Sequence, residues 1–246
     1  MQNSIEATAS ALEALSIQYQ VTANNLANVS TAGFKRQRAT FAQVLQEQMA
    51  PTEPGAPAET ALPQLVGAVA TDFSQGSLIQ TDRPLDVALE GPGFLVVETP
   101  QGPLYTRNGS LQRNAQGQLV DGSGRTIAGE GGPITVPPSG SEATIRIASD
   151  GSVSVGGAAI GKLRLVEFAR PGELKPQGGN CFSAGGVGPA AATKTSVRQG
   201  CQESSNVSAV EELVGLIMVS RLYEANIKAM TTQDERVKSL LQVAMA

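Results

Sequence analysis

Apolar residues recur every seven positions near both ends of the chain, and this spacing constrains the fold more than any other feature. A helix with this repeat carries an apolar stripe that a partner helix must cover. We therefore expect the first segment to pack on the last, or both to pack on other subunits, which favours assembly over catalysis. The repeats fall at Ile5, Leu12, Tyr19 and Leu26, with Thr8, Leu15, Thr22 and Val29 offset, and at Leu213, Ile227 and Leu241, alternating with Leu216, Tyr223, Met230, Val237 and Ala244.

Between these helical segments the sequence changes to short alternating runs and turn residues, which are typical of antiparallel β-structure. Leu85, Val87 and Leu89 alternate with Asp86, Ala88 and Glu90. Asn108-Gly109 and Asp150-Gly151 are dipeptides favoured in hairpin turns. The sequence thus predicts an α+β fold, in which a mostly antiparallel β domain is flanked by heptad helices that form coiled-coil-like assembly elements. The predicted ranges are 1–34 for the N-terminal assembly helix and turn, 35–65 for an extended linker, 66–200 for the β domain and 201–246 for the C-terminal assembly helix.

Two segments are too poor in apolar residues to contribute to a core. The stretch 50–59 contains three prolines and is typical of an extended linker. The passage 184–200 is rich in Gly, Ala and Ser, so we expect it outside the core. The C-terminal helix is expected to begin after Ser205-Asn206 or at Ser208, which with Glu211 fits a capping box.

Composition excludes several classes of function. Histidine is absent, which removes nucleophiles activated by imidazole and most zinc and non-haem iron sites. The net charge of −4 and pI near 5.0 argue against a nucleic-acid partner, and we interpret the short cluster Lys35, Arg36 and Arg38 as solvated charge. No run approaches the ~20 apolar residues of a membrane-spanning segment, and the N-terminus lacks the features of a Sec-type signal.

The two cysteines, Cys181 and Cys201, lie twenty positions apart. They either form a disulfide, which would contribute about 3 kcal/mol in an oxidising compartment, or remain two unpaired thiols. Spacing alone leaves both alternatives open, because a disulfide depends on the separation of the two Cα atoms.

The segment 23–35 reads ANNLANVSTAGFK and resembles the N-terminal signature of the bacterial flagellar rod and hook proteins. In that family an Asn-Asn-Leu-Ala-Asn run precedes a small-polar-Gly-Phe-Lys turn, and every position of this pattern is filled here. Further stretches are similar to the β domain of the same family, and others to its C-terminal helix. The first group comprises 76–78, Thr81, 83–89, 93–94 and 105–110, and the second comprises 203–207, 211–214 and 221–226.

The resemblance implies a structural subunit of the flagellar basal-body rod, a torque-transmitting shaft used in motility. Terminal helices would pack with those of other copies and other rod subunits in a helical assembly, while the β domain forms the outer layer. It further implies export by the flagellar type III apparatus into the periplasmic rod, with no catalytic residue, cofactor or metal. The expected interface residues are Leu12, Tyr19, Asn24, Asn25, Leu26, Asn28, Phe34, Asn206, Leu213, Leu216, Tyr223, Ile227 and Met230.

Within the family, the segments 83–86, 129–134 and 160–168 are similar to the proximal-rod type, and the distal-rod type is the alternative. Cys181 stands where the family pattern suggests a leucine-like residue, so we also interpret it as a small buried hydrophobe.

A secreted glycan hydrolase is the alternative from a different class, because such enzymes use two carboxylates that flank a sugar. The candidate pairs are Asp82 with Asp86 and Glu211 with Glu212. We expect the first pair to hold a proline-containing turn. Adjacent residues of the second point about 100° apart on a helix, which is a poor arrangement for catalysis.

Overall fold

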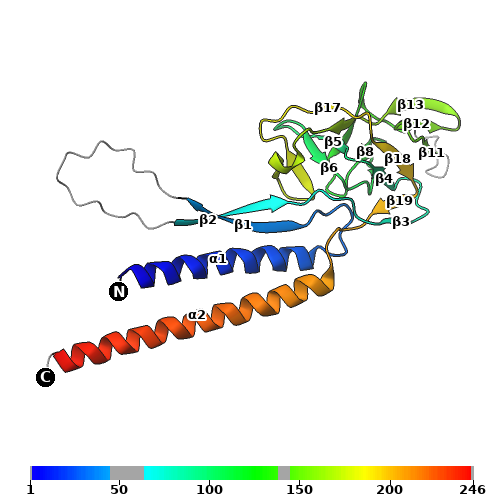
Figure 1. Ribbon diagram of the computed structural model, residues 1–246. Helices are drawn as coiled ribbons and strands as arrows, with labels where there is room; N and C mark the ends of the chain where they lie inside the picture. Colours follow the sequence, from blue (N-terminus) through cyan, green and yellow to red (C-terminus); the bar gives the residue numbers. More distant parts are fainter. Residues whose placement is uncertain (1, 45–63, 138–144, 245–246) are drawn as a thin grey trace, which may run out of the picture. The chain divides into compact units, whose positions relative to one another are not determined.

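The computed structural model describes residues 2–44, 64–137 and 145–244. A long helix lies near each end of the chain, α1 (Gln2–Ala27) and α2 (Ala209–Ala244), and short strands occupy the sequence between them (Figure 1). The predicted α+β class, with a mostly antiparallel β domain between two terminal helices, is confirmed. The segment 50–59, predicted as a linker, lies outside the described residues. Neither helix of the described chain combines the length and the apolar character that crossing a bilayer demands.

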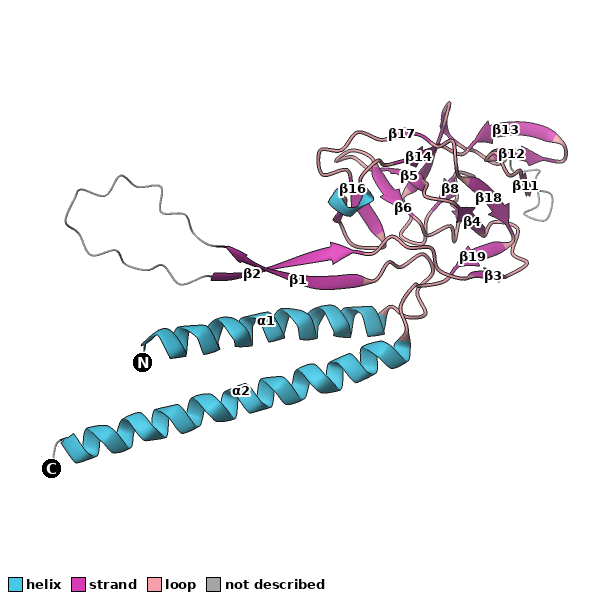
Figure 2. Ribbon diagram, in the orientation of Figure 1, coloured by secondary structure: helices cyan, strands magenta, loops and turns pink. Residues whose placement is uncertain are grey.

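The chain divides into two compact units. The first contains both helices together with β1 (Gln37–Val44) and β2 (Gln64–Thr71), which form a two-stranded sheet. Strand β1 lies inside the range 35–65 that the sequence predicts as an extended linker. The second unit comprises the described residues of 27–36 and 71–207, and consists of strands, loops and one helical turn, η2 (Pro171–Glu173) (Figure 2). The segments 27–36 and 201–207, which the sequence assigns partly to the terminal elements, thus belong to the β-rich unit.

Within the first unit, α1 and α2 run antiparallel along each other. Asn25 near the end of α1 hydrogen-bonds to Glu212 in the first turn of α2. One turn further along, a Cβ atom on Gly215 would lie 3.6 Å from the methyl group of Thr22, so the two helices approach closely. Val219 is buried on the same side of α2 as Glu212.

Antiparallel pairing organises the second unit. Its largest sheet has the order β15-β16-β6-β5-β9-β8-β7, with β10 beside β9 and β14 between β5 and β17. Three smaller sheets are β11-β12-β13, β18-β4 and β19-β3. The bounds are β3 (Leu78–Gln80), β4 (Val87–Glu90), β5 (Phe94–Glu98), β6 (Leu104–Thr106), β7 (Gln112–Arg113), β8 (Leu119–Val120), β9 (Thr126–Gly129), β10 (Gly132–Pro133), β11 (Ile145–Ile147), β12 (Ser152–Val155), β13 (Ala158–Lys162), β14 (Leu165–Glu167), β15 (Lys175–Pro176), β16 (Cys181–Ser183), β17 (Ala190–Ala191), β18 (Ser196–Gln199) and β19 (Cys201–Glu203).

Two hydrophobic clusters fill this unit. The larger is aliphatic and includes the fully buried Leu89, Leu95 and Ile127. The smaller is aromatic, and its rings meet edge to face, as the 4.8 Å separation of the Tyr105 and Phe168 centroids illustrates. Such edge-to-face pairs contribute roughly 0.5–1.5 kcal/mol each beyond the apolar area they bury.

The structure corrects two predictions about β4 and its partner. The alternation expected in 85–89 is absent, because all five of these residues are buried. Strand β18 pairs with β4 and buries Val197, so the passage 184–200 does contribute to the core. A short run of small residues still fits against a strand when a single valine in it faces inward.

The two predicted hairpin turns differ in outcome. Asp150-Gly151 does connect β11 to β12, where Ile147 pairs with Val153. Asn108-Gly109 does not form a hairpin, because β6 pairs with β5 and β16 instead. Gly109 accepts a hydrogen bond from Val87 N, and a Cβ there would lie 1.8 Å from Val87 O, so the position needs glycine for close backbone approach.

Candidate functional site

Asn25, in the family-like signature segment, connects three elements of the first unit. Its Nδ2 donates to Gln37 O at 2.8 Å and to Glu212 Oε2 at 3.3 Å, and its Oδ1 accepts from Gln37 N at 2.8 Å. A side-chain amide donates and accepts at once, so Asn25 pairs with the backbone of Gln37 as a neighbouring strand would. Its side chain is buried within its own chain and fixes α1 to the start of β1 and to α2.

The signature continues into the second unit, where a tight turn follows α1. Asn28 accepts hydrogen bonds from the Thr31 backbone and hydroxyl at 3.1 and 3.2 Å. Gly33 has φ +67°, and a Cβ there would lie 2.5 Å from Asn108 N. Its N–H donates to Glu203 O at 2.7 Å. The turn therefore needs glycine both for its backbone conformation and for close contact with the β domain.

Lys35 is the last residue of this turn. It belongs to a buried ionic cluster that was not predicted from the sequence. Its Nζ donates to Glu203 Oε1 at 2.5 Å and to Ser74 O at 2.7 Å. Glu203 Oε1 also accepts from Gly76 N at 2.9 Å, and Glu203 Oε2 lies 3.8 Å from Arg107 Nε. The interpretation of Lys35 as solvated charge is wrong, because its side chain is fully enclosed.

Burial dominates the electrostatics of this cluster. It lowers the pKa of Lys35, and the nearby Glu203 carboxylate opposes that shift. Burial likewise lowers the pKa of Arg107, against the attraction of the same carboxylate. The Arg107 guanidinium carbon lies 5.5 Å from the Phe94 ring centroid, a cation–π distance. The Glu203 carboxylate is thus the negative charge closest to both buried cations. We therefore expect the packing of the turn at residues 28–35 against the β domain to depend on Glu203.

Asn206 holds the segment that leads into α2. Its Oδ1 accepts from Arg36 N at 2.7 Å, and its Nδ2 donates to Asp72 O at 2.9 Å and to Ser74 O at 3.1 Å. The segments after α1, after β2 and before α2 are therefore joined to one another inside the second unit.

The outer face of α2 is apolar over its first turns. Val210, Val214 and Ile217 lie about 140–180° around the helix from the buried Val219. Their exposed fractions are 71%, 48% and 54%, and Leu213 and Met218 beside them are 47% and 61% exposed. A helix that is apolar all round is normally covered on every side. This part of α2 is covered on one side by its own chain, and none of the described residues covers the other side.

The predicted interface residues fall into three groups in the structure. Tyr19, Asn24, Leu213, Tyr223 and Ile227 are exposed. The half-buried ones are Leu12, Leu26, Asn28, Asn206, Leu216 and Met230, whereas Asn25 and Phe34 are buried in their own chain.

Sequence reasoning missed two sets of residues. The first is the buried cluster of Lys35, Arg107 and Glu203. No local signal marks it, because its three residues are far apart in sequence. The second is the outer apolar face of α2, which the run VGLIMV at 214–219 does signal, since its residues occupy every side of a helix.

The two cysteines form no disulfide and are free thiols. Cys181 lies on β16 opposite Thr106, whereas Cys201 lies on β19 opposite Gln80, in a different sheet. Cys181 is buried in the aliphatic cluster, and burial raises the pKa of its thiol. It behaves as a small hydrophobe.

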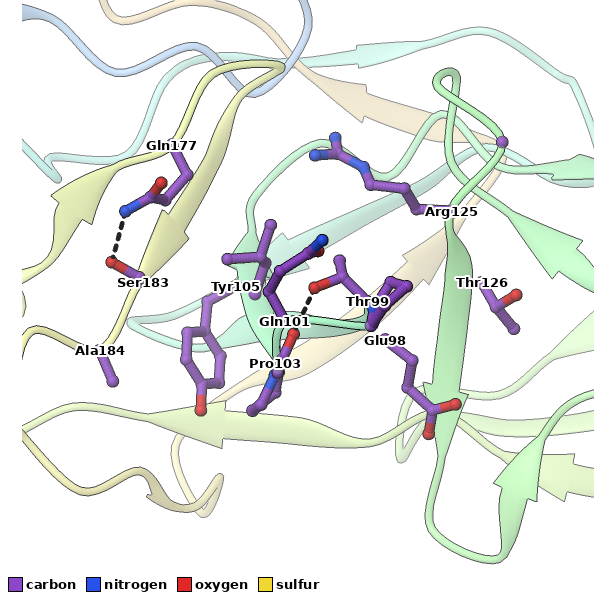
Figure 3. Close-up of a pocket in the computed structure, with 14 residues that line it drawn as sticks. Glu98, Thr99, Gln101, Pro103, Tyr105, Arg125, Thr126, Gln177, Ser183 and Ala184 are labelled. Atoms are coloured by element: carbon purple, nitrogen blue, oxygen red, sulfur yellow. Dashed lines mark hydrogen bonds between the residues drawn. The ribbon is translucent and has the colours of Figure 1, made fainter.

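A cleft of about 830 Å³ opens in the second unit between the loop after β5, Arg125 and the β15–β16 strands (Figure 3). Arg125 donates to Asp121 Oδ2 at 2.7 Å and to Gly179 O at 3.2 Å, and Gln177 donates to Ser183 Oγ at 3.0 Å. Among the described residues that line the cleft, Glu98 is the single carboxylate. This lining does not provide the paired carboxylates of a glycan hydrolase.

The candidate acidic pairs have other partners. Asp86 is fully buried and accepts a hydrogen bond from Thr81 Oγ1 at 2.7 Å, which holds the turn as expected. Glu212 is buried against Asn25. Within the described residues no group of three histidine, cysteine or acidic side chains could hold a metal ion.

Three family profiles match successive parts of the chain. "Flagella basal body rod protein" matches residues 5–35, "Flagellar hook protein FlgE/F/G D1 domain" matches 88–155, and "Flagellar basal body rod FlgEFG protein C-terminal" matches 198–243. They cover the N-terminal signature, part of the β-rich unit, and α2 with the strand before it.

Similar proteins align over almost the full length. The flagellar basal-body rod protein FlgG of Buchnera aphidicola subsp. Schizaphis graminum is 39% identical, over 94% of this chain and 96% of the relative. FlgG of Agrobacterium fabrum is 35% identical, over 92% and 94%. The rod protein FlgF of Salmonella typhimurium is 36% identical, over 92% and 93%. The chain belongs to the flagellar basal-body rod protein family, whose members are structural proteins of the rod in the bacterial flagellum.

Proposed function

We propose that this chain polymerises through α1 and α2, as coiled-coil-like elements, into the torque-transmitting shaft of the flagellar rod. The observation that carries the proposal is the outer face of α2, where Val210, Val214 and Ile217 are exposed beside a face already covered by the same chain. Membership of the rod family supplies the partners, which are other copies and other rod subunits.

The size of this face supports association. Complete burial of a valine, leucine or isoleucine side chain contributes roughly 1.5–3 kcal/mol. Five apolar side chains near the start of α2 are 47–71% exposed, namely Val210, Leu213, Val214, Ile217 and Met218. A neighbour that covers them would therefore contribute several kcal/mol to association. A contact between two different faces of identical subunits does not close on itself and generates a helical filament. A shaft needs such an open assembly.

The two units suggest different roles for the terminal segments and for the β domain. We assign assembly to the terminal segments 1–34 and 201–246 and the outer layer of the rod to the β domain, 66–200. The buried cluster supports this assignment, because Glu203 of the second terminal segment contacts Lys35, which directly follows the first, and Arg107 of the β domain. Family membership also supports export through the flagellar type III apparatus.

Matched isoleucines allow a direct test. Ile217 on α2 and Ile79 on β3 are 54% and 55% exposed. Ile217→Asp should prevent incorporation into basal bodies purified from cells that express the variant, without lowering the stability of the isolated protein. Ile79→Asp should be incorporated as wild type. Equal incorporation of the two variants would contradict assembly through α2.

Position along the rod is a finer question with two candidates. The sequence segments 83–86, 129–134 and 160–168 favour the proximal type, for which FlgF is the named relative. The FlgG relatives at up to 39% identity favour the distal type. Expression in strains that lack one or the other protein separates them, because rescue of motility in the FlgF-deficient strain alone supports the proximal assignment.

A further inference from the structure

One short segment near the end of the β-rich unit, residues 196–206, contacts parts of that unit that are distant in sequence. It contains β18 and β19, and we call it the strap. Among the described strands, β18 alone pairs with β4, and β19 alone pairs with β3 (Figure 1). Two of the small sheets of the unit therefore exist only through the strap.

The first half of the strap covers the central strand β4. Residues 87–89 of β4 have no exposed surface, and Val197 on the facing β18 is buried in the same aliphatic cluster. Gly200 N donates to Asp86 O at 2.8 Å. Loss of the strap would expose apolar side chains of β4 to water and leave its backbone groups without their partners in the sheet.

The side chain of Gln199 links two further segments. Its Nε2 donates to Pro84 O at 2.7 Å and to Ile145 O at 2.9 Å, and its Oε1 accepts from Ile147 N at 3.1 Å. One amide thus satisfies three backbone groups, as a strand between the two segments would. The strap therefore fixes β11 to the segment before β4.

The second half of the strap holds the turn at residues 28–35. Glu203 contacts Lys35 and Arg107, and Asn206 accepts a hydrogen bond from Arg36 N at 2.7 Å. Without the strap, the two buried cations would lose the carboxylate that lies closest to both. Such an uncompensated charge cannot remain enclosed without a large cost, so the turn would detach as well.

We propose that the strap closes the β-rich unit, so that the unit stays folded only while the strap is bound and opens as a whole when the strap detaches. The turn, β3, β4 and β11 all meet at the strap, and each would lose its partners in the same event. The inference concerns the β-rich unit alone and does not depend on assembly through α2.

The position of the strap in the sequence gives this arrangement a consequence. The β-rich unit comprises the described residues of 27–36 and 71–207, so the strap is its last strand-forming part. Synthesis delivers a chain with its N-terminal part first. Contacts that span a long stretch of sequence also form slowly, and Lys35 and Glu203 are 168 positions apart. The β-rich unit of a growing chain therefore stays open until its final residues have been delivered.

Native-state hydrogen exchange of the full chain tests the proposal. Nuclear magnetic resonance follows each amide at low concentrations of urea, and the rate, corrected for the intrinsic rate of that residue, reports the free energy of the opening that exposes it. Two amides report on the strap and two on the rest of the unit. The strap amides are Val197 N and Gly200 N, which donate to Ser149 O and Asp86 O, and the others are Val96 N and Leu119 N, which donate to Arg164 O and Ile134 O.

We expect the strap amides to exchange within about fivefold of the slower of Val96 and Leu119, because one opening exposes them all. Ala192 N, which donates to Leu165 O at 3.2 Å, is the matched control. It follows β17, an exposed strand that pairs with β14 alone, and should exchange faster than the strap through local opening. Strap amides that exchange more than about fivefold faster than both Val96 and Leu119 would overturn the proposal, because the strap would then open while the unit stays folded.

Discussion

Replacement of Glu203 by glutamine removes the carboxylate from the buried ionic cluster and keeps its shape. Two cations, Lys35 and Arg107, then remain enclosed without the carboxylate that lies closest to both. At an effective dielectric of about 20, the attraction lost is roughly 7 kcal/mol for the 2.5 Å contact and roughly 4 kcal/mol for the 3.8 Å contact. Changes in solvation offset much of this, and removal of one partner from a buried pair destabilises proteins by about 3–5 kcal/mol.

Deprotonation of Lys35 sets an upper limit on the stability that the variant can lose through this side chain. To neutralise a lysine at pH 7 takes about 1.36 kcal/mol for each unit below its ordinary pKa near 10.4, or about 5 kcal/mol. We therefore expect Glu203→Gln to lower the free energy of unfolding by about 4 kcal/mol at pH 7. Because the pKa of Lys35 is lowered in the folded state, the unfolded state binds more protons up to that ordinary pKa, so the stability of the variant should rise as the pH increases from 7 towards 10.

Urea unfolding of the full chain, followed by tyrosine fluorescence, measures this change, because Tyr105 is buried in the same unit and tryptophan is absent. Glu130→Gln serves as control, since Glu130 pairs with Lys162 at the surface at 3.1 Å and such pairs contribute roughly 0–1 kcal/mol. A Glu203→Gln variant no less stable than the control, or one whose loss of stability relative to wild type grows with pH, would show that Glu203 does not compensate the buried cations.

Three further substitutions probe the turn at Gly33, the contact between α1 and α2, and the loss of stability at low pH. Gly33→Ala should lower the free energy of unfolding by about 2 kcal/mol or more, because of its φ of +67° and the contact with Asn108, whereas Gly131→Ala, in open space, should be close to neutral; urea unfolding measures both. Asn25→Asp should set two carboxylates together and lower the melting temperature at pH 7, and the additional change Glu212→Gln should restore most of it. Burial alone would raise the pKa of Glu167, but hydrogen bonds from Lys194, Thr195 and Thr193 hold it below its usual value. Its contribution to stability is therefore present above the ordinary glutamate pKa and lost as the pH falls through the lowered one, so melting temperatures measured between pH 7 and 3 should fall less for Glu167→Gln than for wild type.

The terminal helices and the β-rich centre were predictable because their signals are local. Helical repeats and strand-and-turn patterns each occupy one continuous stretch of residues, and so does the ANNLANVSTAGFK segment. Local signals also carried the β11–β12 hairpin at Asp150-Gly151.

Features that depend on distant partners were not predictable. Lys35 is buried because Glu203, 168 positions away, neutralises it, and neither residue shows this alone. Strands β1 and β2 are separated in sequence by the proline-containing stretch 50–59, which hid their pairing. The side-chain amide of Asn25 forms hydrogen bonds within its own chain, although the sequence around it suggested contacts between subunits.

We propose that the outer face of α2 is an assembly surface of the rod. A density map of isolated basal bodies at side-chain resolution tests it most directly. We predict that Val210, Val214 and Ile217 are covered by a helix of a neighbouring subunit in the rod. Density that shows these three side chains facing solvent, with neighbouring subunits contacting only the β-rich unit, would contradict assembly through α2.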